Sequence, residues 1–175
     1  MKGQLFSFDL ILSISILLLL FGITVSVFSR SDAVMKEFAF EREISQNGNA
    51  ALSSLIETSG YPSNWEQLAF TDSNVKALGL ASSANSLNSQ KAGKFFDLAN
   101  SNENNYVLTK RVLGIDFPSA NYTLEIIDLE GNSEYSTTFP INSQITNFYS
   151  IYAFQRLALL NEKPVKLLLK IWVKK

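Results

Sequence analysis

The residues that most often perform catalysis or bind transition metals are missing from this sequence. Its 175 residues include no cysteine and no histidine, which excludes disulfides, thiol nucleophiles, the usual zinc sites and the commonest general base. Serine and threonine are abundant, but no histidine or lysine dyad is available to activate one as a nucleophile. The carboxylates form no spaced cluster that would bind an oxygen-ligated metal. We therefore predict no catalytic residues, no metal site, no cofactor and no enzymatic activity.

Charge excludes another class of function. The chain has 15 basic and 16 acidic residues and a net charge of −1, so we expect no nucleic acid as partner. Apolar residues make up 46% of the sequence, enough for a packed core. The length favours one domain plus an anchor over two full domains. No motif identifies a small-molecule ligand.

Aromatic residues and one glycine could belong to a binding site. Tyr61 and Trp65 could form an aromatic ledge, although closing the end of a core is the favoured interpretation. Gly79 is predicted to be a turn glycine, because it lacks the partner glycines and the Lys-Ser or Lys-Thr pair of a phosphate-binding loop.

Two further motifs concern the surface of the chain. Asn121 begins the only Asn-x-Ser/Thr sequence, where a glycan could be attached. Lys170, Lys174 and Lys175 are predicted to form a solvated strand face and tail, and contact with a membrane surface is the less favoured alternative.

A continuous run without charged residues extends from Leu10 to Ser29 and is a candidate membrane segment. As a helix with a rise of ~1.5 Å per residue, its roughly 20 residues span about 30 Å, the thickness of a bilayer core. It is apolar on every face, unlike the amphipathic helix of a soluble protein. We predict a transmembrane helix over residues 10–29 and membrane lipid as a partner.

The fate of this helix depends on the residues that precede it. A cleaved secretory signal has a more basic start and a shorter apolar run of about 7–15 residues, so an uncleaved anchor fits the length better. The preceding stretch, residues 1–9, places Lys2 and Gly3 before the run and Asp9 at its edge. This pattern resembles the class III signal peptide of archaeal type IV pilin-like proteins.

The resemblance implies three things about this segment. A prepilin peptidase would cut between Gly3 and Gln4, and the hydrophobic helix would be retained. Asp9 would be the sixth mature residue, one later than the acid of many pilins. It would pair with the new N-terminal amine of a neighbouring pilin-like subunit, or else be an ordinary interfacial residue.

Two arguments predict opposite orientations of the chain in the membrane. Lys2 precedes the run, whereas Arg30, Lys36 and Arg42 follow it, so the positive-inside rule would place the body of the chain in the cytoplasm. The pilin resemblance implies an extracellular body, and we follow it in expecting a single-pass membrane protein with its C-terminal domain outside the cell.

The rest of the sequence predicts a helix followed by a sheet. Val34, Phe38, Ile44, Leu52, Leu55 and Ile56 recur at helical spacing and predict an amphipathic stalk to about Thr58. A weak point falls at residues 46–49, and Gly60 and Pro62 follow the end. Beyond it we expect a helix capped by Asn88, with Phe95, Phe96 and Leu98 inside, and one over residues 106–113 capped by Asn105. Residues 82–89 are predicted to form a surface loop.

Four strands are predicted over residues 122–129, 133–139, 148–160 and 165–173. In the last, Val165, Leu167, Leu169, Ile171 and Val173 form one apolar face, which we expect to pack on the stalk. The predicted fold class is α+β, with the long helix packed on a C-terminal antiparallel meander. The chain divides into a leader and cleavage region (1–9), a transmembrane helix (10–29), a stalk (30–59), a loop and short-helix region (60–119) and a sheet (120–175).

The body of the sequence is also similar to archaeal pilin-like proteins of unassigned function. The similar segments are residues 58–65, 75–81, 87–91 and the ending from Arg156 to Trp172. The resemblance implies a surface or membrane-anchored structural subunit. The alternative is a single-span extracellular binding or accessory protein that does not polymerise.

Overall fold

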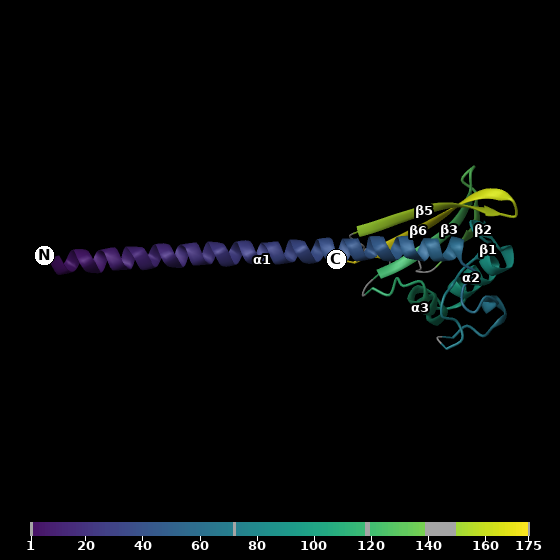
Figure 1. Ribbon diagram of the computed structural model, residues 1–175, viewed down its shortest axis with the longest axis horizontal. Helices are drawn as coiled ribbons and strands as arrows, with labels where there is room; N and C mark the ends of the chain where they lie inside the picture. The colour runs from purple at the N-terminus through teal and green to yellow at the C-terminus, as the bar shows by residue number, and fades with distance from the viewer. Residues whose placement is uncertain (1, 72, 118–119, 139–149, 175) are drawn as a thin grey trace. The chain divides into compact units, whose positions relative to one another are not determined.

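The computed structural model describes the backbone of residues 2–71, 73–117, 120–138 and 150–174, and their side chains from Phe8 onward apart from residue 33. The chain forms two compact units, residues 1–43 and 44–175. Helix α1 (Lys2–Glu57) supplies all of the helical structure of the first unit and enters the second. The second unit adds a mixed sheet of six strands (Figure 1), so the predicted α+β class is confirmed.

The sheet has the strand order β1-β2-β5-β6-β3-β4. Its strands are β1 (Ala81–Ser83), β2 (Ser86–Leu87), β3 (Ala120–Asp128), β4 (Ser133–Ser136), β5 (Ser150–Leu160) and β6 (Lys163–Val173). The pairs β3–β4, β3–β6 and β5–β6 are antiparallel, as expected for the C-terminal part of the chain, whereas β2 and β5 are parallel. Because β6 lies between β3 and β5, these strands do not follow the sequential order of a simple meander.

The predicted strand boundaries differ from the observed ones by a few residues. Strand β6 begins two residues early, because the turn needs only Asn161 and Glu162, which both have positive φ (50° and 65°). Such a two-residue turn matches the twist of a hairpin. Strand β4 ends at Ser136, and the predicted strand residues 139, 148 and 149 lie outside the described part of the chain.

The prediction of a surface loop over residues 82–89 is wrong. This segment contains most of the β1–β2 hairpin and the first residue of helix α2. Its serines and asparagines suggested a loop, but tertiary contacts decide the conformation: Asn85 N–H donates to Ile56 O (3.0 Å), and Asn85 O accepts from Leu159 N–H (2.7 Å). The hairpin also satisfies carbonyl groups at the end of α1, which would otherwise lack partners.

Two helices and a 3₁₀ turn cover the rest of the second unit: α2 (Ser89–Ser101), α3 (Glu103–Val112) and η1 (Trp65–Gln67). Asn88 caps α2 as predicted, since its side chain accepts from the amides of Gln90 and Lys91. The prediction that Asn105 caps the next helix is wrong. Asn102 is the cap, and its side chain accepts from the amide of Asn105 (2.9 Å), so α3 starts one turn earlier.

The core of the second unit is built as the alternation in β6 predicts. All five apolar residues of its inner face are buried, and Leu52, Leu55 and Ile56 of α1 are buried as well. Phe154 of β5 lies directly opposite Leu169, so both side chains are on the same face of the sheet. A Cβ added at Gly48 of α1 would clash with the Phe154 ring. The last turns of α1 therefore pack on this face, and Gly48 permits the close approach.

The predicted weak point of α1 at residues 46–49 is held by side-chain contacts within the second unit. Asn47 donates to Gly114 O (3.0 Å), and Asn49 accepts from the guanidinium of Arg156 (2.9 Å). The helix runs through these residues without a break. Local propensity is low here, and tertiary contacts compensate for it.

Side-chain hydroxyl groups continue the edge of β3 where β4 stops. The Tyr106 hydroxyl binds both the amide and the carbonyl of Tyr122 (2.8 Å each), and Thr137 Oγ1 accepts from Leu124 N–H (2.9 Å). The rings of Tyr106 and Tyr122 stack at 4.9 Å. Burial raises the pKa of both tyrosines. The edge is thus closed by helix α3 and is not free to pair with another strand.

Candidate functional site

The first candidate is the N-terminal part of α1, which is long and apolar enough to cross a membrane. None of the most apolar stretch of this helix is buried within the protein. The exposed fraction of its large apolar side chains ranges from 49% at Leu12 to 70% at Phe8. A surface of this kind is unfavourable in water and favourable in a bilayer core.

Three of the five serine and threonine side chains within this stretch find partners in the helix itself. Ser15, Thr24 and Ser29 each donate a hydroxyl hydrogen to the carbonyl four residues earlier, at 2.8–2.9 Å. A hydroxyl without a partner would be costly in hydrocarbon, and this bonding removes most of the cost. For these three hydroxyl groups the cost of membrane insertion is therefore small.

The residues predicted for processing and assembly lie at the start of the same helix. Gly3 and Gln4 are in its first turns, but their side chains lie outside the described residues, so cleavage stays a prediction. Asp9 is exposed, at the start of the uncharged run. Its predicted pairing with the amine of a neighbouring subunit also stays a prediction.

The remaining surface residues of the prediction lie on the sheet or beyond it. Asn121 is half-buried in β3, opposite Trp172 of β6, and its modification stays a prediction. Lys170 is half-buried and forms an ion pair with Glu125 across the two strands (3.3 Å), whereas Lys174 is exposed. Lys175 lies outside the described residues.

The structure separates the two aromatic residues of the predicted ledge. Trp65 is buried (1% exposed), and its indole N–H donates to Gly79 O (2.9 Å), which confirms the core interpretation for this residue. Tyr61 is 68% exposed. Gly79 approaches Thr58 so closely that a Cβ would lie 2.5 Å from the threonine hydroxyl oxygen. Its role is close packing of two backbone segments.

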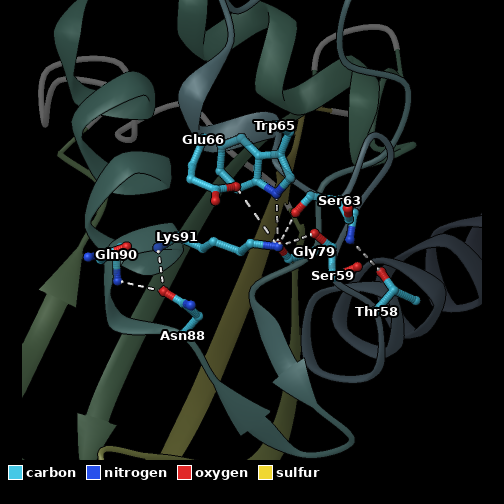
Figure 2. Close-up of polar contacts among 10 residues, drawn as sticks. Thr58, Ser59, Ser63, Trp65, Glu66, Gly79, Asn88, Gln90 and Lys91 are labelled. Carbon is cyan, nitrogen blue, oxygen red and sulfur yellow. Dashed lines mark hydrogen bonds and ion pairs between the residues drawn. The ribbon is translucent and has the colours of Figure 1, made fainter.

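A buried lysine beside these residues is a second candidate (Figure 2), and the sequence analysis missed it. The ammonium group of Lys91 donates to Ser59 O (2.7 Å) and Ser63 O (2.6 Å), and it lies 3.9 Å from a carboxylate oxygen of Glu66. The side chains of Lys91 and Glu66 are only 7% and 17% exposed. The three oxygen atoms come from one short segment that follows α1.

A hollow of about 490 Å³ lies between the β3–β4 and β5–β6 turns, with Asp128, Glu130, Glu134, Asn161 and Lys163 among its lining residues. Hydrogen bonds from the Asn132 side chain and from backbone amides lower the pKa of Asp128. This carboxylate thus holds the turn together. Among the described residues, no group of three or more acidic side chains is placed to bind a metal ion.

Comparison with known proteins adds nothing to these observations, since no protein family, no curated protein and no solved structure matches this chain.

Proposed function

We propose that this chain is a type IV pilin-like structural subunit, anchored or assembled through its N-terminal helix. The observation that supports the proposal best is the apolar stretch of α1, whose large side chains from Phe8 to Phe28 are all exposed within the chain. Such a surface requires lipid or other apolar helices as its surroundings. The proposal includes no catalysis, because the chain lacks the usual catalytic groups.

The helix also has the continuity that this role requires. It runs from Lys2 to Glu57, and its last turns are part of the core of the second unit. We place the domain outside the cell.

Closure of the β3 edge opposes strand addition from another chain at this side of the sheet. The backbone groups of Tyr122 and Leu124 in β3, which β4 does not reach, form hydrogen bonds with the side-chain hydroxyl groups of Tyr106 and Thr137. At the outer side of β4, Asn100 binds Ser136 O (3.0 Å) and Thr138 N–H (2.6 Å). A strand from another chain would have to displace these hydrogen bonds to pair here.

The alternative is a membrane-anchored extracellular accessory protein that does not polymerise. It shares the anchor and the domain with the first proposal and differs in the fate of the leader. A pilin-like subunit loses Met1–Gly3 and retains the apolar helix, whereas a plain anchor retains Met1. Processing at Gly3 therefore separates the two.

The first test is the variant Gly3→Phe in the full chain, expressed with a prepilin peptidase. A peptidase that cuts after glycine must admit a small residue before the bond, so we expect the bulky ring to reduce processing at least tenfold. Membrane insertion should be unchanged, because the apolar run is intact. Mass spectrometry of the membrane fraction measures the unprocessed share.

The matched control is Gly22→Phe, which introduces the same side chain within the apolar run. No atom lies within 4 Å of a Cβ added at Gly22, so the substitution is tolerated by the chain itself. We expect this variant to be processed like the unmodified protein. Equal processing of the Gly3 variant and this control would exclude Gly3 as the recognition residue.

A further inference from the structure

We propose that the segment from Ser59 to Glu66 forms an oxygen-lined site for a monovalent cation, and that the ammonium group of Lys91 is the cation that occupies it. This inference concerns the second unit and does not depend on the proposed function. It predicts that a free primary ammonium ion can take the place of the side chain when the lysine is shortened.

The first argument is the geometry of the site. Ser59 O and Ser63 O accept hydrogen bonds from Lys91 Nζ at 2.7 and 2.6 Å. These distances are short even for charge-assisted hydrogen bonds. The two carbonyl groups lie on either side of Tyr61 in sequence, so this short loop folds around the ammonium group (Figure 2). Without a cation, both carbonyl oxygens would lose this hydrogen-bond partner.

The second argument is the position of the lysine, which contradicts two general preferences. Lysine is almost never fully buried, yet Lys91 is 5% exposed. It also lies in the first turn of α2, where the helix dipole disfavours a positive charge. A residue placed against both preferences requires specific compensation, and the two carbonyl groups with the Glu66 carboxylate provide it.

The third argument is the role of Glu66. Its Oε2 atom is buried, forms no hydrogen bond and lies 3.9 Å from Lys91 Nζ. At this distance the carboxylate balances the charge of the ammonium group without saturating its donors. The site thus contains two carbonyl oxygens that bind the ammonium group directly and one carboxylate that balances its charge. All three interact with the charged end of Lys91 and not with its aliphatic stem.

The test uses the full chain in detergent micelles and follows thermal unfolding by tryptophan fluorescence, to which buried Trp65 contributes. The variant Lys91→Met retains most of the stem but removes the charge and the donors. We expect its midpoint to fall by about 6–12 °C, because two partly buried hydrogen bonds to carbonyl groups are lost and a buried carboxylate oxygen loses its counter-charge. The control Lys94→Met alters a half-buried lysine of the same helix and should change the midpoint by less than about 2 °C.

The variant Lys91→Ala opens space for a free ion. We expect methylammonium chloride to raise its midpoint by several degrees more than tetramethylammonium chloride at the same ionic strength, because only methylammonium has N–H donors and fits between the two carbonyl groups. Lys91→Met, whose side chain fills the path, should show no such difference. If Lys91→Ala folds only in methylammonium, the proposal is supported in the same way.

Two results would overturn the proposal. One is a Lys91→Met midpoint equal to that of the unmodified protein, since the charge would then be unnecessary. The other is a Lys91→Ala variant, folded or unfolded, that responds equally to the two salts. In that case the oxygen atoms would not form a site that recognises a cation.

Discussion

A chain that begins at Arg30 is expected to remain in the soluble fraction, whereas the full chain should pellet with membranes and resist carbonate extraction. The removed segment contains the Leu10–Ser29 run, in which 14 residues are Leu, Ile, Val or Phe. At about 0.3–0.6 kcal/mol each, they favour insertion by about 4–8 kcal/mol. The shortened chain keeps the second unit, which has its own core.

A full-length variant separates the effect of the apolar run from that of chain length. Leu18→Arg combined with Leu19→Arg should cost about 6–8 kcal/mol at the helix centre, enough to cancel the gain from the run. Val34→Arg combined with Met35→Arg adds the same charges beyond the run and should leave the chain in the membrane. Retention of the Leu18 and Leu19 variant in carbonate-washed membranes would contradict the anchor.

The second large effect is expected in the core of the sheet. Leu169 is fully buried in β6, with Leu124 of β3 and Phe154 of β5 opposite it. Leu169→Ala in the full chain should reduce the free energy of unfolding by about 2–5 kcal/mol, a large part of the ~5–15 kcal/mol that stabilises a typical domain. Denaturant unfolding followed by tryptophan fluorescence measures the change.

Lys170→Ala is the matched control, one residue along the same strand and on its opposite face. Its ammonium group pairs with Glu125 at 3.3 Å, but both side chains are about one-third exposed (32% and 28%). Solvent screens such a pair, so we expect a loss below about 1 kcal/mol. Similar losses for the two variants would mean that the register of β6 is wrong.

Periodicity predicted the elements that have long, regular patterns. The uncharged run and the following helical spacing identified α1, and the alternation in β6 identified its buried face correctly. The prediction of Asn88 as a cap is confirmed, and Phe95 and Phe96 of the helix that it starts are buried as expected. In each case the local pattern and the tertiary environment favour the same structure.

Elements that depend on distant contacts could not be predicted in this way. The strands of the β1–β2 hairpin are three and two residues long, and the hairpin is held by hydrogen bonds to Ile56 and Leu159. The position of β6 between β3 and β5 is likewise set by pairing and not by local sequence. Val34 and Phe38 fit the stalk pattern but are exposed.

The lysine site had only a weak signal in the sequence. Lys91 follows the Asn88 cap, whereas Ser59 and Ser63, whose carbonyl groups bind its ammonium group, lie 32 and 28 residues earlier in the sequence. A lysine in a first helical turn is an unfavourable placement that could have drawn attention. Its burial, however, follows only from how the loop after α1 folds over α2.

The mass of the protein extracted from membranes tests the pilin-like assignment most directly. We predict a mature chain that begins at Gln4, lacks only Met1–Gly3 and still partitions with the membrane through the Leu10–Ser29 helix. Prepilin processing separates this assignment from a plain anchor. A membrane-bound chain that retains Met1, or a mature chain that begins beyond Ser29, would contradict it.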